Sequence, residues 1–390
     1  KHYGKADKIT ITAVAPHSYH EYGEVLGNIE LANGRVVMET GSKAAAIKVN
    51  ADAAKITDGT AVVSVDTTAS AVSVVVPADV KTAIEGKEGN GITASTDKIV
   101  TDSTVIENMD KFAGGLGTEE SPYLIATAEQ FNALSSINNE RIYVGLVNEK
   151  VIDSKIDLTL AGKELYIAGN GAELSGKLSL TLAKVAFENV KFTYAGNNNK
   201  SGGDVAYAIN ADYVSITNSY ISTKARTGLN LNVKTAEIKG NTFDSGASLV
   251  YNIIEFGLGD GKTDIDKVNI IDNVFNGQSE NNCISIYNMV ENAVINIKNN
   301  RFGYVANALR ISNPKNATAT FNVENNSYTG TSFSDSYQYA GFIIFEDYSR
   351  KSSQDFTKIT INIVNLTFKG EKLSARGINT DKQVYYVFDD

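Results

Sequence analysis

Apolar and polar residues alternate in a pattern that returns seven times in the second half of the chain. Each copy reads apolar, any residue, apolar, any residue, Asn or Asp, two further residues, and an aromatic or aliphatic residue. The last position of the seven copies is occupied by Phe192, Ile221, Phe243, Phe275, Phe302, Tyr328 and Phe368. A period of two buries one face of a strand, and copies spaced by roughly 20 to 50 residues are typical of a solenoid. The pattern therefore predicts stacked β-coils.

The polar residue three places before the end of each copy predicts a tight corner. It is Asn or Asp in six of the seven copies and Gly240 in the other. Asn and Asp tolerate left-handed backbone angles, which such a corner needs. Four copies carry a further asparagine one place later: Asn241, Asn273, Asn300 and Asn326. We expect the asparagines at the corner position to stack along the axis as a ladder of hydrogen-bonded amides.

A second short strand precedes most copies, at residues 208–209, 229–231, 284–286, 309–311 and 343–345. Each repeat is thus predicted to be one coil of two or three strands, and stacked coils bury one continuous core. Residues 160–390 resemble the right-handed parallel β-helix, or pectin-lyase-like, superfamily. This superfamily includes lyases, hydrolases, tailspikes and non-catalytic adhesins, so the resemblance implies a fold and leaves the activity open.

One helix is predicted before the solenoid. Thr127 and Gln130 form the pattern of a capping box, and Phe131, Leu134 and Ile137 form one apolar stripe after it. Residues 114–125 resemble the Gly-x-Gly-Thr…Pro-Tyr-x-Ile lead-in of bacterial surface β-helix proteins. The resemblance implies that the helix caps the open end of the solenoid, where an uncovered coil invites aggregation.

The first 110 residues have a different composition, rich in Ala, Val, Thr and Asp. Short apolar groups at spacings of about 8–12 residues suggest a sandwich, and a solenoid of short coils is the alternative. We therefore predict an all-β protein with three parts. These are a small β-domain at 1–110, a lead-in with its capping helix at 111–155, and a right-handed parallel β-helix at 156–390.

Charge and composition exclude some functions. The 390 residues carry a net charge of −9, and the pI is near 5.1, which disfavours nucleic acids and anionic membranes as partners. No apolar run of about 18 residues predicts a transmembrane span. The single cysteine, Cys283, is expected to be a buried core thiol. An acidic solenoid rich in Asn, Thr and Ser suggests an exported bacterial protein, either tethered at the cell surface or outer membrane or secreted. The oligomeric state stays open.

Two groups of residues are candidates for ligand binding. The longest repeat carries an aromatic insertion, and Tyr337, Tyr339 and Tyr348 within it are predicted to contact a glycan, because Tyr stacks on sugars while its hydroxyl stays hydrated. Asp260, Asp264 and Asp266 form an acidic loop whose oxygens suit Ca²⁺, the one cofactor that the sequence suggests.

Catalytic residues are not identified by the sequence. The charged candidates in the solenoid fall at positions that look unrelated within their coils: Asp204, Lys224, Arg226, Glu255, Arg310 and Glu346. The triplet His17, His20 and Glu21 lacks zincin spacing and is expected to be a loop. We therefore expect a non-catalytic, adhesin-like protein that binds a polysaccharide or a host or matrix ligand. A polysaccharide lyase or glycoside hydrolase and a structural spacer are the alternatives.

Overall fold

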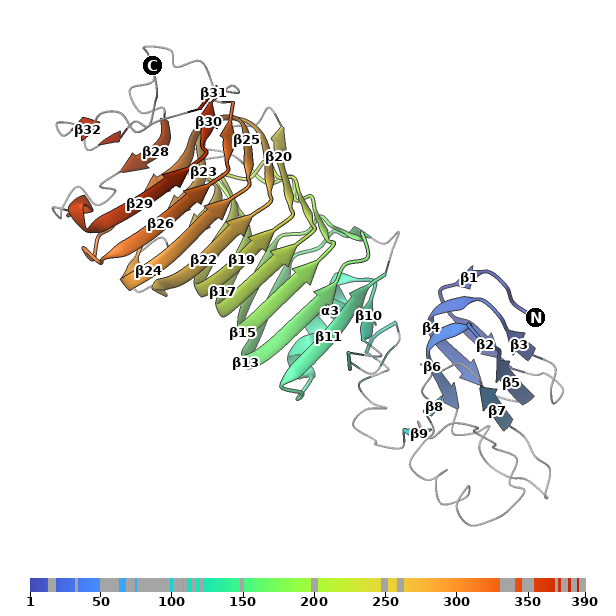
Figure 1. The fold of residues 1–390 in the computed structure, drawn as a ribbon. Helices are drawn as coiled ribbons and strands as arrows, with labels where there is room; N and C mark the ends of the chain where they lie inside the picture. The colour runs from blue at the N-terminus through green and yellow to red at the C-terminus, as the bar shows by residue number, and fades with distance from the viewer. Residues whose placement is uncertain are drawn as a thin grey trace. The chain divides into compact units, whose positions relative to one another are not determined.

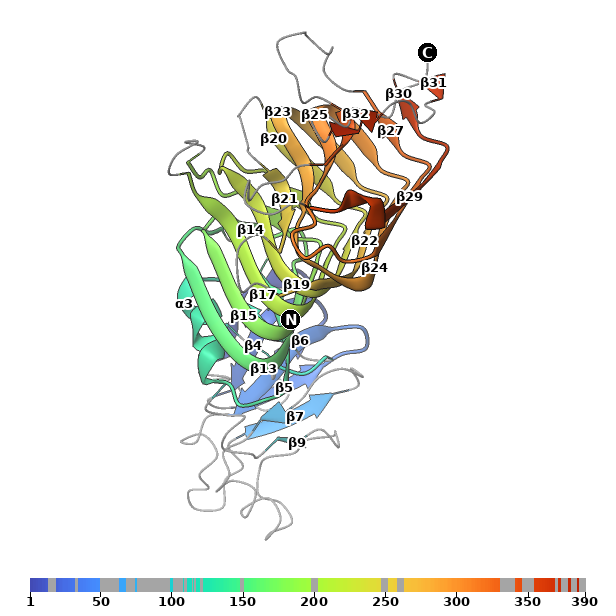
Figure 2. The same cartoon turned by 90° about the vertical axis from the view of Figure 1, so that its left-hand side faces the viewer.

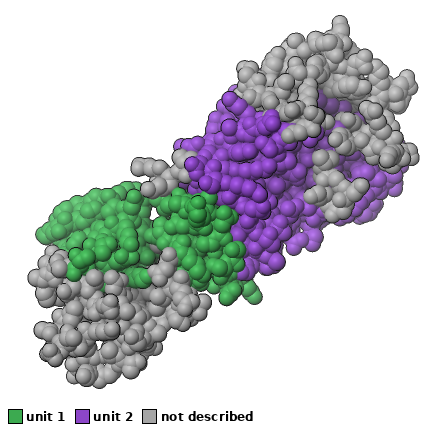
Figure 3. Space-filling model, turned by 180° about the vertical axis from the view of Figure 1, so that it is seen from behind, with its two compact units in different colours: residues 1–147 green, residues 148–390 purple. Residues whose placement is uncertain are grey.

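The computed structural model describes most of the chain in two compact units, Lys1–Val147 and Asn148–Asp390 (Figure 3). The described residues are 1–12, 19–31, 34–49, 63–67, 74–75, 99–100, 108, 111–113, 115, 117–119, 122–147, 151–197, 203–246, 252–257, 263–329, 341–345, 354–368, 371–372, 378–379 and 384–385.

The second unit is a stack of coils (Figure 1). Its strands pair in parallel in three separate columns, which we call the first, second and third sheets. The first sheet contains the first halves of four long strands, namely β13 (Ile156–Ala168), β15 (Leu178–Glu188), β17 (Val205–Thr217) and β19 (Thr227–Lys239). It continues through β21 (Asn252–Phe256), the ends of β23 (Val274–Ile286) and β25 (Arg301–Ile311), and β28 (Gly341–Phe345).

The second sheet contains the second halves of the same four long strands. It continues through β22 (Ile265–Ile271), β24 (Met289–Lys298), β26 (Ala319–Glu324) and β29 (Ile359–Val364). Figure 2, a view along a different direction, shows β13, β15, β17 and β19 side by side. Equivalent residues of successive coils therefore lie in columns that run along the stack.

The third sheet is made of very short strands. They are β12 (Val151–Ile152), β14 (Glu173–Leu174), β16 (Lys191–Phe192), β18 (Tyr220–Ile221), β20 (Thr242–Gly246), the starts of β23 and β25, β27 (Ser327–Tyr328) and β30 (Thr367–Phe368). The chain ends in two antiparallel pairings, of β30 with β31 (Glu371–Lys372) and of β32 (Ile378–Asn379) with β33 (Val384–Tyr385). The prediction of an all-β chain with stacked parallel coils is confirmed.

The corner between the second and third sheets has the predicted left-handed backbone. The residues three places before the repeat ends have φ from 50° to 67°: Asn189, Asn218, Gly240, Asp272, Asn299, Asn325 and Asn365. This one left-handed residue turns the chain from the second sheet to the third. The apolar residue at the end of each copy then points into the core. Phe243, Phe275 and Phe302 stack on one another, with ring centroids 4.7 and 4.9 Å apart.

The buried asparagine ladder lies one residue later than predicted. It is formed by Asn241, Asn273, Asn300 and Asn326, each at most 2% exposed. In each step the Oδ1 atom of one asparagine accepts hydrogen bonds from the backbone N–H and Nδ2 of the previous one, at 2.9 to 3.1 Å. The side chains of the corner residues also form hydrogen bonds between coils, but these lie at the surface. An example is the bond from Asn299 Nδ2 to Asp272 Oδ1 at 3.0 Å.

The interior of the coils is apolar. The inward columns of the first and second sheets consist almost entirely of fully buried Leu, Ile, Val and Ala. Cys283 is 0% exposed, as predicted, and burial raises the pKa of its thiol. This core holds the coils in register and so fixes which outward side chains become neighbours.

The first unit is also built from parallel strands. One sheet contains β1 (Lys5–Ala6), β2 (Ile9–Ile11), β4 (Glu24–Leu31), β6 (Lys43–Val49), β8 (Val74–Val75) and β9 (Ile99–Val100). A second contains β3 (Tyr19–Glu21), β5 (Gly34–Met38) and β7 (Val63–Thr67). Between the two alternatives for this region, parallel pairing fits short solenoid coils, because sandwiches are built from antiparallel sheets.

The predicted helix is present as α3 (Ala128–Ala133), which continues into the 3₁₀ turn η1 (Leu134–Ser136). It follows β10 (Tyr123–Ile125) and precedes β11 (Arg141–Leu146), two parallel strands of this unit. The Thr127 side chain accepts a hydrogen bond from the backbone N–H of Gln130. The Gln130 side chain accepts from Ala126 at 2.7 Å and not from the N-cap residue. The predicted apolar stripe of the helix is buried. The role of the helix as a cap of the solenoid stays a prediction.

Candidate functional site

The residues predicted to bind ligands are only partly within the described chain. Tyr337, Tyr339, Tyr348 and Asp260 lie outside the described residues, so these predictions are untested. Both carboxylate oxygens of Asp264 lie within 2.8 Å of Lys315 Nζ, and Asp266 is exposed on β22. Within the described residues, no three His, Cys, Asp or Glu side chains are grouped to hold a metal. The calcium site therefore stays a prediction.

The prediction that the charged candidates are scattered was wrong for Glu255 and Arg310. Glu255 on β21 pairs in register with Ser285 on β23, and Ser285 pairs with Arg310 on β25. In the preceding coil the same column holds Asn230 on β19, which pairs with Glu255. We call these residues the charged column. Glu346 lies outside the described residues, Lys224 is exposed, and Asp204 pairs elsewhere, with Lys177 at 3.4 Å.

A row of asparagines runs beside the charged column, three residues earlier in each strand. Asn252, Asn282 and Asn307 pair in register on β21, β23 and β25, and we call them the amide column. Asn282 Nδ2 donates to Asn252 Oδ1 at 3.2 Å, and Asn307 Nδ2 donates to Asn282 Oδ1 at 3.0 Å. The row forms a second ladder of amides, separate from the one at the corner.

The amide column and the charged column lie beside each other on the first sheet. Glu255 alternates with Ile254 and Phe256, which are 0% exposed in the core, so its own side chain points outward. Asn252 Nδ2 donates to Glu255 Oε2, and Ser285 Oγ donates to Asn252 Oδ1 at 2.7 Å. These bonds place the side chains of the amide column against those of the charged column.

Glu255 is a buried carboxylate within this surface. It is 2% exposed, and Asn230 Nδ2 donates to its second oxygen at 3.3 Å. Burial raises the pKa of Glu255, and the hydrogen bond from Asn252 together with the positive charges of Arg226 and Arg310 offsets part of that rise.

Two guanidinium groups lie near enough to this carboxylate for their positive charges to lower its pKa. Arg310 is 1% exposed, and its Cζ atom lies 5.7 Å from the centroid of the Tyr287 ring, which is itself 3% exposed. Arg226, directly before β19, is half-buried. We call Arg226, Tyr287, the charged column and the amide column together the polar cluster.

The polar cluster reaches from the surface into the interior. Arg226 and Asn230 are half-buried at one side, whereas Glu255, Ser285 and Arg310 are at most 2% exposed. Among its described residues, the cluster contains two guanidinium groups, those of Arg226 and Arg310, and one carboxylate, that of Glu255. An arrangement of this kind suits a ligand that brings negative charge and many hydroxyl groups.

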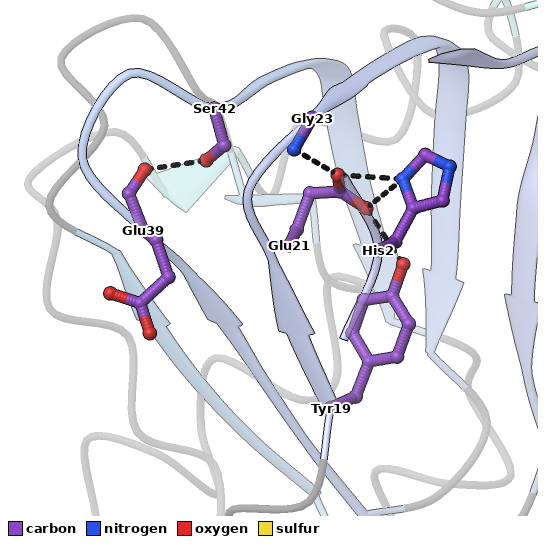
Figure 4. A network of polar contacts seen from close by, with 6 residues as sticks. All are labelled: His2, Tyr19, Glu21, Gly23, Glu39 and Ser42. Carbon is purple, nitrogen blue, oxygen red and sulfur yellow. Dashed lines mark hydrogen bonds and ion pairs between the residues drawn. The ribbon is translucent and has the colours of Figure 1, made fainter. Parts of the chain in front are cut away.

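A second polar network lies in the first unit, where a loop was predicted (Figure 4). His20 and Glu21 are in strand β3, so the loop prediction was wrong for them, and His17 lies outside the described residues. The Glu21 carboxylate is 0% exposed and accepts from Tyr19 OH at 2.7 Å and from the Gly23 N–H at 2.6 Å; His2 Nδ1 lies 2.8 Å away. Burial and this carboxylate raise the pKa of Tyr19. These contacts link two coils and stabilise the fold of this unit.

Comparison with known proteins adds no relative. No protein-family model matches the chain, and neither a curated protein nor a solved structure is significantly similar to it. Within the described residues, no helix combines the length and apolar character needed to span a membrane. The parallel strand register alone shows the fold.

The sequence contained an overlooked signal for the polar cluster. The three strands that carry it share an asparagine, two apolar residues and a polar residue: Asn252 to Glu255, Asn282 to Ser285, and Asn307 to Arg310. A comparison by charge alone misses this pattern, because Asn282, Ser285 and Asn307 are uncharged. Aligning the strands by this pattern places Glu255 and Arg310 in one column.

Proposed function

We propose that this chain is an exported bacterial surface protein with a right-handed parallel β-helix that binds an acidic glycan without cleaving it. The polar cluster is the observation that supports this proposal. Arginines bind carboxylates and sulfates through paired hydrogen bonds, and amide groups match the hydroxyls of sugars. The half-buried Arg226 and Asn230 are the groups that a glycan meets first.

Binding is favoured over hydrolysis because of the number of carboxylates in the polar cluster. A glycosidase places two carboxyl groups on either side of the scissile bond. Among the described residues of the polar cluster, Glu255 is the only carboxylate, and it is bonded to Asn252 and Asn230. The repeating columns suit a long polymer that crosses several coils, which is the behaviour expected of an adhesin-like protein.

A screen on a glycan array, with and without Ca²⁺ and with analysis of products, tests this proposal. We expect binding of uronate-containing or sulfated glycans and no cleavage. Arg226→Gln removes one guanidinium and is expected to weaken binding at least tenfold, since one charged hydrogen-bonding group contributes about 1.5–3 kcal/mol. Lys224→Gln is the matched control, because Lys224 is exposed two residues away. Absence of binding to any acidic glycan would instead favour the structural spacer.

A polysaccharide lyase is the second candidate, and the grouping of Arg226, Arg310 and Tyr287 favours it. β-Elimination needs a cation that neutralises the uronate carboxylate and a base that removes the neighbouring proton. Unsaturated ends in the products of a bound acidic glycan, lost in Tyr287→Phe, would replace the binding proposal by the lyase. Retention of intact polymer supports binding alone.

A further inference from the structure

A third row of asparagines runs along the second sheet, whereas the polar cluster lies on the first. Asn269, Asn296, Asn322 and Asn362 pair in register on β22, β24, β26 and β29, which lie side by side (Figure 1). Asn296 Nδ2 donates to Asn269 Oδ1 at 2.8 Å, and the same bond recurs at 2.9 Å in the next two steps. We call this row the surface ladder.

The surface ladder lies on the outer face of the second sheet. Asn296 alternates with Ile295 and Ile297, which are 0% exposed in the core, so its side chain points outward. Three of the four asparagines are half-buried, and Asn362 is exposed. The asparagines of the corner ladder, in contrast, are at most 2% exposed. The amides of the surface ladder are therefore within reach of a ligand.

Each inner amide of the surface ladder keeps hydrogen-bonding capacity. A side-chain amide has two N–H donors and an oxygen with two lone pairs. The ladder bonds of Asn296 and Asn322 use one N–H and one lone pair of each. The same donor and acceptor thus recur once per coil, at the strand spacing of about 4.8 Å. This spacing is close to the advance of one sugar unit along an extended β-1,4-linked glycan, whose hydroxyls both donate and accept.

Aliphatic side chains flank the surface ladder. Val294, two residues before Asn296, is 36% exposed, and Val364, two residues after Asn362, is 50% exposed. Ile271 is half-buried in the same column as Val364. A pyranose ring combines polar hydroxyl edges with apolar C–H faces. The ladder and its flanks offer the matching combination of amides and aliphatic groups.

Charge indicates which kind of glycan fits this face. On these four strands, the ladder and the two outward columns beside it contain three charged residues: Lys267, Lys298 and Glu324. Lys298 and Glu324 pair with each other at 2.9 Å. The face is thus almost neutral in a protein of net charge −9. Complementary charge is what selects an ionic partner, so this face favours an uncharged one.

We propose that the surface ladder binds an uncharged, extended β-1,4-linked glycan that runs along the stack with about one sugar unit per coil. The amides bond to its hydroxyls, and Val294 and Val364 contact its C–H faces. This site is separate from the polar cluster and does not depend on the binding of an acidic glycan there. A second copy of the chain is disfavoured as the occupant, because stable protein interfaces bury a more apolar centre than two isolated valines provide.

Calorimetric titration of the full chain tests this proposal, with cellohexaose and chitohexaose as probes and cellobiose as the short control. A hexasaccharide is long enough to contact all four amides, whereas a disaccharide contacts about two. We expect at least one hexasaccharide to bind, and to bind at least tenfold more tightly than cellobiose. Its dissociation constant should change less than about twofold as salt is raised, because screening acts on charges.

Variants of the full chain locate the bound glycan. Asn296→Ala combined with Asn322→Ala is expected to weaken binding at least tenfold, since the two central amides are lost. Val294→Glu leaves the ladder in place and puts a charge on its apolar flank, so it should also weaken binding if the double variant unfolds in a thermal scan. Asn276→Ala is the matched control, because Asn276 is an exposed asparagine on the third sheet.

Four results would overturn the proposal. They are absence of binding by both hexasaccharides, equal affinity for the hexasaccharides and cellobiose, a loss in Asn276→Ala as large as in the ladder variants, and self-association of the chain that the ladder variants abolish.

Discussion

Truncating one asparagine of the buried corner ladder should cost far more stability than its small size suggests. The Asn273 side chain is 1% exposed, and its Oδ1 accepts from the Asn241 backbone N–H and Nδ2 at 2.9 and 3.0 Å. Its Nδ2 lies within hydrogen-bond distance of the carbonyls of Ile238 and Ile271, at 2.8 and 3.0 Å, and of Asn300 Oδ1 at 3.0 Å. Asn273→Ala removes all of these bonds at once.

The magnitude follows from the groups left behind. The change leaves a buried backbone N–H, an amide and two carbonyls short of a partner. A buried polar group that loses its partner costs about 1–3 kcal/mol, and water that enters the small space recovers part of this. We therefore expect Asn273→Ala to lower the free energy of unfolding by about 3–5 kcal/mol.

Urea unfolding followed by circular dichroism measures the total effect, and hydrogen exchange of the Asn241 amide measures the local one. The local measurement matters because long solenoids can unfold in parts. Asn299→Gly is the matched control, since it keeps the left-handed corner and removes only an exposed amide bond. It should cost less than about 1 kcal/mol. Equal losses in both variants, or an unchanged Asn241 exchange rate in Asn273→Ala, would refute the reasoning.

Three further predictions concern other parts of the second unit. Gly176→Ala should destabilise the protein by at least about 2 kcal/mol in thermal unfolding, because a Cβ atom there would lie 1.9 Å from the Ser154 carbonyl oxygen. Cys283 should react with a thiol reagent only as fast as the solenoid opens, because it is buried and its pKa is raised; labelling as fast as that of a free thiol contradicts this. The raised pKa of Glu255 means that its protonated form favours the folded state. The stabilisation is complete below the unfolded pKa of about 4.3 and is lost as the pH rises through the folded pKa. The stability of the wild type relative to Glu255→Gln should therefore fall as the pH is raised from about 4 to 7, and a rise would show the opposite shift.

Local sequence was sufficient for the coil itself. Apolar residues at a period of two, followed by a residue that accepts a left-handed backbone, specify a strand and the corner after it. Asn189 and Asp272 have this conformation, as predicted, with φ of 53° and 58°. The helix at α3 was equally readable, because Thr127 and the apolar stripe are local signals.

The position of the buried ladder depended on geometry that the sequence does not state. In one coil Asp272 occupies the corner and Asn273 directly follows it, and in the next coil Asn299 and Asn300 hold the same two places. Asn and Asp both favour corners, so residue type did not show which of the two neighbours is buried. The left-handed turn directs the first side chain outward and the next one inward, and only the folded corner decides which amide enters the interior.

The sequence by itself thus determined the strands, the corners, the helix α3 and the apolar core, because each depends on residues a few positions apart. Tertiary structure alone decided the parallel stacking of the first unit and the polar cluster of the second. Glu255 and Arg310 are 55 residues apart in the chain, and coils of unequal length separate them. The number of residues between two positions therefore does not show whether they pair in register. The stacked core aligns the coils and brings Glu255 and Arg310 into one column.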